Sequence, residues 1–349
     1  MIKPLQSLRF IAIFFVFLSH LLFFENTTYE YFFLRFLYGG YWGVTFFLVL
    51  SGFVMSYNYQ ESFKDLNRKK YLEFIKKRLI RLFPIHIFTF ILAVPFYILA
   101  IINYPIKYFF KALLNILLIQ SLIPIREVYF SFNSVSWYLS CCFILYLLTP
   151  LLLFLLSKIM KSNKYLIIYG FLIYLIAFLA VIIWKEHRHF TWIFYISPFF
   201  RIFDFSLGLL LGIFIKVNKF EKSRKYYTII EISSVVFFIA MYLCYPYINK
   251  AYTYGVYYLP IMLLIVAIFS INRGYISKLL ENKRLVALGG VSFEFYVIHK
   301  LIIDYLVFSS PNINPILIAL ISFIMSILSA IILNRIFKNQ MFNKFIRFN

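Results

Sequence analysis

The chain has 349 residues, of which 63 % are hydrophobic and 14 % are charged, whereas a soluble domain is about half apolar and a quarter charged. This composition excludes a soluble enzyme, and the 45 Phe and 29 Tyr exclude a disordered chain. The formal net charge of +22 on so apolar a chain indicates the basic cytoplasmic loops of a multi-pass membrane protein, not a nucleic-acid-binding protein.

Apolar runs along the chain predict the membrane helices, because a helix needs about 20 residues to cross the hydrocarbon core of a bilayer. The runs in chain order are 5–24, 41–59, 83–102, 109–124, 137–157, 164–184, 198–216, 227–246, 255–272, 288–308 and 313–335. The first run follows Lys3 like a signal peptide, but no small-residue cleavage site follows Phe24. We therefore expect a retained first helix and a single membrane domain over residues 1–349.

Loop charges set the predicted orientation. The loop 60–82 carries eight Lys and Arg residues, which is the strongest cytoplasmic signal in the chain. It places the N-terminus inside the cell and the segment 25–40 outside. Further basic clusters, which we also assign to the cytoplasm, lie at 158–164, 216–225 and 273–284 and in the tail after 334.

All these clusters face the cytoplasm only if one run between 83 and 157 does not cross the membrane. The shortest run, 109–124, is flanked by Lys107 and Arg126. We interpret it as a re-entrant or interfacial segment on the outer side, which is allowed where protein covers the backbone. The predicted fold is an all-α polytopic integral membrane protein with about ten transmembrane helices, this short segment and both termini inside. Eleven true crossings would place some basic loops outside.

Ionisable residues inside the runs need an explanation, because a charge at mid-bilayer costs about 2.5–3.5 kcal/mol on insertion scales. Arg201 and Asp204 are three residues apart, so that they can form an ion pair on one helix face. Lys300 and Asp304, four residues apart, can do the same. Glu231 lies near a cytoplasmic end, where snorkelling explains it, and the same explanation suits Arg9.

His20 and His299 have no such explanation. A lone histidine in a helix is usually a packed one, but two deep histidines in a chain with five point to proton transfer near neutral pH. The predicted topology places polar groups from four helices between mid-membrane and the outer face, as an intramembrane site requires. The groups are His20, His299, Trp137, Tyr138, Ser140, Arg201 and Asp204.

Metal and thiolate chemistry have little support in the sequence. His187 and His189 can chelate a metal if the backbone is extended, but no third ligand is obvious, so we predict no metal site. Cys141 and Cys142 lie in an apolar helix without an adjacent basic residue, which argues against a catalytic thiolate.

Six short motifs occur in a fixed order along the chain. They are Arg9 with Ser19-His20; Gly43-Val44, Phe46-Phe47 and Ser51-Gly52-Phe53; Arg78, Arg81 and Pro84; Trp137, Tyr138 and Ser140; Arg201, Phe205, Gly208 and Gly212; and Leu288-Gly289, Ser292, Tyr296 and His299. In this order they resemble the membrane acyltransferase-3 family, bacterial integral-membrane enzymes that acylate exported glycans and related acceptors. Two positions depart from the family pattern, since Cys142 and Asp204 stand where family members often have Glu.

The resemblance implies a membrane-bound O-acyltransferase of the cell (inner or plasma) membrane. It would move an acyl group from cytoplasmic acyl-CoA, most simply acetyl-CoA, to a hydroxyl of an exported glycan. The implied partners are acyl-CoA, a glycan or lipid-linked glycan and membrane lipids, without nucleic acid and without a permanently bound cofactor.

The resemblance also implies roles for residues. His20 would carry the acyl group or take the proton of an acceptor hydroxyl, which leaves an acyl-histidine relay and direct general-base transfer both open. Arg9 and His299 would assist at this catalytic centre. Arg78 and Arg81, and also Arg9, would hold the phosphates of the donor. The residues that we assign to substrate binding are Arg78, Arg81, Trp137, Ser140, Arg201 and Asp204.

A glycan or lipid flippase with an intramembrane proton relay is the alternative function. Buried histidines and Arg–Asp pairs also occur in proton pathways of transporters. The sequence shows no inverted repeat, which many transporters have. Loss of one acyl unit from a surface glycan on gene deletion would favour the enzyme, whereas lipid-linked glycan trapped inside would favour the flippase.

Overall fold

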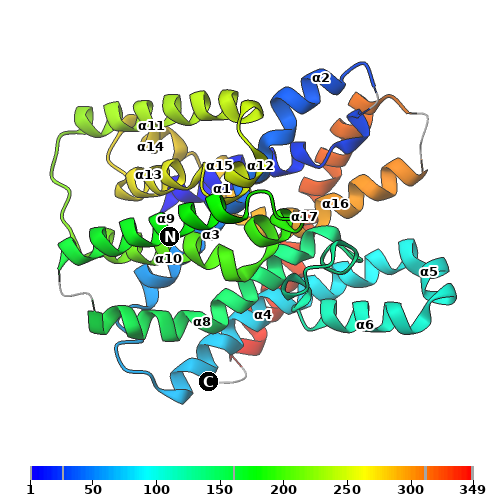
Figure 1. Ribbon diagram of the computed structural model, residues 1–349, viewed down its shortest axis with the longest axis horizontal. Coiled ribbons are helices and arrows are strands. Elements are labelled where there is room, and N and C mark those ends of the chain that lie inside the picture. Colours follow the sequence, from blue (N-terminus) through cyan, green and yellow to red (C-terminus); the bar gives the residue numbers. More distant parts are fainter. Residues whose placement is uncertain (1, 26, 160–161, 310–312, 347–349) are drawn as a thin grey trace. The chain divides into compact units, whose positions relative to one another are not determined.

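The structure is a computed structural model that describes residues 2–25, 27–159, 162–309 and 313–346. The predicted cytoplasmic loop residues 160 and 161 and the end of the tail lie outside these ranges. The described residues form helices and no β-strand, which confirms the predicted all-α class (Figure 1). They divide into two compact units. Unit 1 comprises residues 1–12, 41–73 and 144–289, and unit 2 comprises residues 13–40, 74–143 and 290–349.

The helices confirm a multi-pass membrane protein. Within the described ranges, eight helical segments are long and apolar enough to cross a membrane. The bent pair α15 (Lys283–Gly290) and α16 (Ser292–Ser309), with 64° between the two helices, makes nine if it is one span. Helix α1 (Lys3–Ser19) adds 17 residues, or about 26 Å at 1.5 Å per residue. This length is a few Å short of the roughly 30 Å hydrocarbon core, so the described residues give eight or nine candidate spans where the sequence predicts about ten.

Unit 1 is built around two closely packed helices, α3 (Trp42–Tyr59) and α10 (Pro198–Val217). A Cβ on Gly52 would lie 2.0 Å from the carbonyl oxygen of Phe205, and one on Gly208 would lie 2.1 Å from that of Val49. Only glycine allows two backbones to approach this closely, as at other helix contacts inside membranes. The unit also contains α9 (Asn163–Trp184), α11 (Arg224–Cys244), α12 (Lys250–Gly255), α13 (Leu259–Ile271), α14 (Tyr275–Leu280), α15 and the second part of α8 (Trp137–Ile159).

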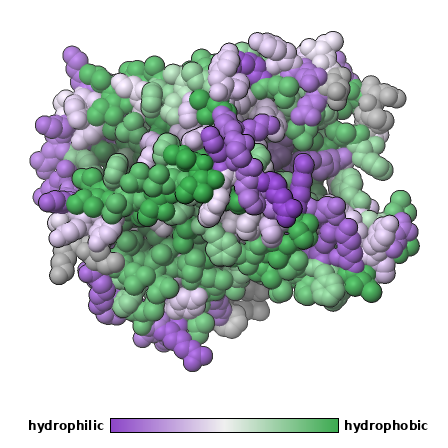
Figure 2. Space-filling model, viewed as in Figure 1, coloured by the Kyte–Doolittle hydropathy of each residue, from purple (hydrophilic) through white to green (hydrophobic). Residues whose placement is uncertain are grey.

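The outward surface of α9 is apolar. Ile167 is 66 % exposed, Phe171 64 % and Ile183 71 %. Figure 2 shows hydrophobic side chains gathered on the face that includes α9. Such exposure is unusual for a soluble protein but expected for a helix that faces lipid.

Glu231 on α11 corrects a prediction. The sequence suggested a carboxylate that snorkels toward the cytoplasm, but Glu231 is fully buried. Its oxygens accept hydrogen bonds from the backbone N–H groups of Gly274 and Ile276 and from the N–H and hydroxyl of Ser277. The carboxylate therefore caps the start of α14, where unpaired N–H groups favour negative charge.

Unit 2 contains the end of α1, α2 (Glu30–Phe32), most of α4 (Arg68–Ala93), α5 (Ile98–Asn103), α6 (Pro105–Ile116), α7 (Arg126–Tyr129), the start of α8, α16 and α17 (Pro315–Ile346). Aromatic rings join α1 to α16 and α17: Phe17 contacts Phe295 and Phe323 with ring centroids 5.9 and 5.4 Å apart. Helix α1 ends at Ser19, so the predicted helical run 5–24 is too long and His20 directly follows the helix.

The run 109–124 does not form a crossing helix. Only α6 is helical there, and its 12 residues span about 18 Å, which is too short for a membrane. The polar residues Lys111 and Asn115 of α6 are buried, whereas Ile106 and Phe109 are 74 % and 64 % exposed. This inverted amphipathic helix fits the predicted re-entrant or interfacial segment. We call residues 117–136, which follow it, the re-entrant segment; half of them are buried, and they form only the short α7 and two single helical turns.

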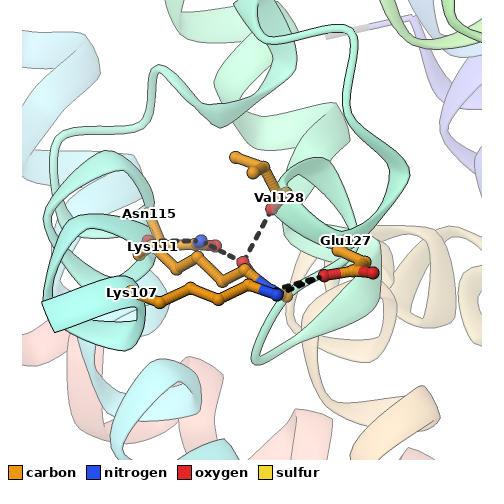
Figure 3. Close-up of polar contacts among 6 residues, drawn as sticks. Lys107, Lys111, Asn115, Glu127 and Val128 are labelled. Atoms are coloured by element: carbon orange, nitrogen blue, oxygen red, sulfur yellow. Dashed lines mark hydrogen bonds and ion pairs between the residues drawn. The ribbon is translucent and has the colours of Figure 1, made fainter. Parts of the chain in front are cut away.

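An ion-pair cluster fastens α6 to the re-entrant segment (Figure 3). Lys107 and Lys111 both donate to Oε2 of Glu127, at 3.0 and 3.3 Å. The hydrogen bond from Lys107, followed by that from Lys111, holds the pKa of the Glu127 carboxyl below its usual range. The carboxylate therefore stays charged, and the cluster intact, throughout the neutral range.

Candidate functional site

Two histidines from distant parts of the chain meet in unit 2. Nε2 of His299 lies 3.5 Å from Nδ1 of His20, and the ring centroids are 5.0 Å apart at an interplanar angle of 75°. His299 is fully buried on α16, and His20 is half-buried at the end of α1. The sequence selected both residues, and the structure places them in contact.

The end of α1 fixes the ring of His20. The backbone N–H of His20 bonds to the carbonyl of Phe17, which leaves the carbonyl of Val16 without its helical partner. The Nδ1 atom of His20 lies 2.7 Å from this carbonyl oxygen, and the Ser19 hydroxyl also donates to it. Because a carbonyl only accepts hydrogen bonds, Nδ1 of His20 carries a proton.

The same reasoning assigns the tautomer of His299. Its Nδ1 donates to the carbonyl of Tyr296 at 2.7 Å and, more weakly, to that of Phe295 at 3.2 Å. The Phe295 ring stacks on the imidazole with an interplanar angle of 10°. Nε2 of neutral His299 therefore has a lone pair, which faces the Nδ1–H group of His20.

These two assignments leave one reactive nitrogen. Nε2 of neutral His20 has a lone pair, and it makes no hydrogen bond within the part of the chain that the structure describes. It is thus available to take a proton or to attack an electrophilic carbon. His299 accepts from the opposite side of the ring, as the orienting group of a catalytic dyad does.

The start of α8 lies beside this pair. The ring of Tyr138 is 5.4 Å from that of Tyr296, which in turn lies 5.9 Å from the His299 imidazole. Trp137 is almost fully buried. Ser140 is fully buried, and its hydroxyl oxygen contacts the N–H and hydroxyl of Ser121 at 3.2 and 2.8 Å. Ser140 thus joins α8 to the re-entrant segment.

Lys300 and Asp304 form the predicted ion pair on the turn of α16 that follows His299. The side chain of Lys300 is 18 % exposed and that of Asp304 38 %. Lys300 directly follows His299 in the chain. A cation with its own counter-ion therefore lies beside the histidine pair.

The predicted pair Arg201–Asp204 also forms, but in unit 1. Its N–O distance is 2.7 Å, and both side chains are fully buried. The Arg201 guanidinium also donates to the carbonyls of Tyr195 at 3.0 Å and Tyr254 at 2.7 Å. These bonds attach α10 to two other segments, which is a structural role for the guanidinium. Oδ1 of Asp204 has no partner among the described residues.

The three arginines that we assigned to the donor are divided between the units. Arg9 is half-buried in unit 1 and donates to Oε1 of Gln6 at 3.3 Å. Arg78 and Arg81 lie on one face of α4 in unit 2. Arg78 packs over the Phe74 ring at 5.1 Å, and Arg81 is exposed.

Sequence reasoning missed a buried polar group in unit 2. Asn115, Gln120, Asn133 and Ser136 are at most 1 % exposed. His86 belongs with them because its Nε2 donates to the carbonyl of Asn115 at 2.8 Å. The sequence does show amide side chains inside an otherwise apolar stretch, but only the packed structure shows that these amides are buried together.

Among the residues that the structure describes, no three His, Cys, Asp or Glu side chains are placed to hold one metal ion. The rings of His187 and His189 are 5.6 Å apart, and Nδ1 of His187 accepts from the backbone N–H of His189.

Comparison with known proteins identifies the chemistry. The family model described as an acyltransferase domain, acyltransferase-3, matches residues 3–335. The acyltransferase MdmB of Streptomyces mycarofaciens is 27 % identical over 274 residues, which is 75 % of this chain and 68 % of that protein. No solved structure matches the chain.

Proposed function

Because the chain belongs to the acyltransferase-3 family and is thus a membrane acyltransferase, we propose that it is an O-acyltransferase with His20 at its catalytic centre. The donor is acyl-CoA, most simply acetyl-CoA, and the acceptor is a hydroxyl of an exported glycan. The observation that carries the proposal is the free lone pair on Nε2 of His20, oriented by two acceptors on the other side of the ring.

Direct transfer proceeds in one displacement at the acyl carbon. Nε2 of His20 takes the proton of the acceptor hydroxyl while the hydroxyl oxygen bonds to the acyl carbonyl carbon. The carbon–sulfur bond then breaks, and the proton passes from His20 to the leaving thiolate. The products are the ester and free CoA, and His20 returns to its neutral form.

The relay uses the same nitrogen. Nε2 of His20 attacks the acyl carbon, the carbon–sulfur bond breaks, and an acyl-imidazolium and the CoA thiolate form. The acceptor hydroxyl then attacks the acyl carbon, the carbon–nitrogen bond breaks, and the hydroxyl proton passes to the thiolate, so that His20 returns to its neutral form. In both routes the His20 ring becomes positively charged. Its Nδ1–H group then bonds more strongly to the carbonyl of Val16 and to Nε2 of His299, which stabilises the charge.

Arg78 and Arg81 support a cytoplasmic donor site. They lie three residues apart in a basic part of α4, and guanidinium groups bind phosphates in a bidentate geometry. They would meet the anionic end of acyl-CoA at the inner face. This arrangement requires the orientation that the loop charges predict: the protein lies in the cell (inner or plasma) membrane, and both termini are in the cytoplasm.

Mass spectrometry of surface glycans from cells with and without the gene tests the proposal. We expect one acetyl unit per modified residue to be lost on deletion and restored by the wild-type gene. An unchanged acylation pattern would refute the glycan acceptor. Lipid-linked glycan accumulating inside the deletion strain, without any change in acylation, would favour a flippase.

A further inference from the structure

The buried amides and hydroxyls of unit 2 form a chain of hydrogen bonds in which every donor points the same way along the chain. The Ser131 hydroxyl donates to the carbonyl of Val128 at 2.6 Å, and Asn115 Nδ2 donates to Ser131 Oγ at 2.7 Å. The Ser136 hydroxyl donates to Asn115 Oδ1 at 3.3 Å, and Gln120 Nε2 donates to Ser136 Oγ at 3.1 Å. Since the chain ends on a carbonyl, every proton in it points away from Gln120. Part of this chain is drawn in Figure 3.

Three buried atoms around this chain have no partner among the described residues, and all three are hydrogen-bond acceptors. They are Oε1 of Gln120, Oδ1 of Asn133 and Nδ1 of His86. The nitrogen of His86 is an acceptor because its Nε2 donates to the carbonyl of Asn115. The oxygen of Asn133 is assigned because its Nδ2 donates to the carbonyl of Val297 at 2.8 Å. Burying such an atom without a partner destabilises the folded protein.

The backbone of the re-entrant segment is strained at two places. Leu118 has φ 55° and Phe132 has φ 57°, a left-handed conformation that is unfavourable for an L-residue. Both residues are buried, and the Phe132 ring packs on that of Phe90 with centroids 4.6 Å apart. Packing therefore enforces this conformation, as it does in segments that bind or switch.

The strained segment is joined directly to the turn of α16 before His299. Besides the bond from Asn133 to Val297, the Tyr296 hydroxyl donates to the carbonyl of Val135 at 2.7 Å. Tyr296 also supplies the carbonyl that orients the His299 ring. A ligand held by Asn133 is therefore within about one helical turn of the histidine pair.

We propose that the re-entrant segment, through Asn133 and Gln120, and α4, through His86, bind a neutral substrate group that is rich in hydrogen-bond donors. The inference rests on the proposed function and adds a binding site to it. Two substrates carry such a group: the glycan acceptor through its hydroxyls, and acyl-CoA through the amides and hydroxyl of its pantetheine arm. None of the three acceptor atoms touches solvent in this conformation, so the segment shifts to admit the substrate.

The proposal predicts opposite effects on stability and binding. Asn133→Leu removes the unpaired Oδ1 and the hydrogen bond from Nδ2 to the carbonyl of Val297. Because that carbonyl lies inside helix α16, the melting temperature of the purified protein should not fall. The substitution removes a hydrogen bond to substrate, so KM for one substrate should rise by about five- to tenfold. Gln120→Met should raise the same KM.

Asn115→Leu is the matched control. Both polar atoms of the Asn115 amide are paired within the protein, so this variant should lower the melting temperature and leave KM of the folded fraction unchanged. The two candidate ligands are separated by varying acetyl-CoA at fixed glycan, and then glycan isolated from the deletion strain at fixed acetyl-CoA.

Several results would overturn the proposal. If Asn133→Leu is fully active and has the wild-type KM for both substrates, the binding site is refuted and the proposed acyltransferase function is not. A melting temperature lowered as far as in Asn115→Leu, or failure of Asn133→Leu to fold, would show that Asn133 is structural. Absence of acetyl transfer by the wild-type protein would instead refute the proposed function, and the binding site with it.

Discussion

His20 and His299 make similar local contacts but have different chemical roles. Each Nδ1–H group donates to a backbone carbonyl, of Val16 and Tyr296 respectively. The difference lies in the two Nε2 atoms. Nε2 of His299 faces His20, whereas Nε2 of His20 has no protein partner within the described residues. Position, more than residue type, makes His20 the candidate for proton or acyl transfer.

This assignment predicts a graded response at His299. His299→Ala removes an acceptor from the His20 ring but leaves the carbonyl of Val16, so we expect kcat to fall less than the 10²–10⁴-fold that general acid–base groups contribute. His299→Gln should recover part of the loss, because its Oε1 can accept from His20. Acetyl transfer by purified protein measures both. A loss with His299→Ala as large as with His20→Ala would contradict the orienting role.

The candidate site was only partly predictable at this scale. His20 and His299 stand out in the sequence because both are ionisable groups inside apolar runs. Their contact joins residues 279 positions apart, which no local pattern predicts. Gln120 and Asn133 were missed because an amide becomes informative only when packing buries it without a partner.

Individual helices follow the sequence where hydrophobicity alone decides them, as in α9, which lies close to the predicted run 164–184. The prediction was wrong where local polar contacts end a helix. Helix α1 stops at Ser19 because Ser19 and His20 bond to the carbonyl of Val16, although apolar residues continue to Phe24. Hydropathy cannot report such an end, since the capping atoms are in the side chains.

Glycine contacts give a second prediction, for the pair α3 and α10. Gly208→Ala would place a Cβ 2.1 Å from the carbonyl oxygen of Val49, and two packed backbones cannot both move aside. We expect less folded protein in the membrane and a lower melting temperature. Gly170→Ala on α9 is the control, because its nearest atoms would be 3.7 Å away. Equal melting temperatures for the two variants would show that the close contact is not required.

For the whole molecule, composition was sufficient to predict the class, whereas the orientation from loop charges stays a prediction. The number of membrane crossings was harder to predict. The run 109–124 has the composition of a membrane helix, but it forms part of the short α6 and of the re-entrant segment. The positive-inside rule excluded that run as a crossing, and the 12-residue helix agrees with it. The division into two units has no sequence signal, since each unit combines separate parts of the chain.

The orientation is a third prediction. A reporter fused after Asn67 should be cytoplasmic, because that loop carries the densest positive charge. One inserted in the segment 25–40 should be outside the cell. Alkaline phosphatase and green fluorescent protein fusions measure both positions. An external reporter after Asn67 would reverse the orientation and move the proposed donor site to the wrong face.

We propose that Nε2 of His20 performs the transfer. Acylation of surface glycans in a deletion strain that expresses His20→Ala tests this role. The expected result is loss of acylation with normal protein level in the membrane, because removing a polar side chain does not hinder insertion. His187→Ala, at an exposed histidine, should acylate as the wild type does. Normal acylation by His20→Ala at a normal protein level would contradict the mechanism.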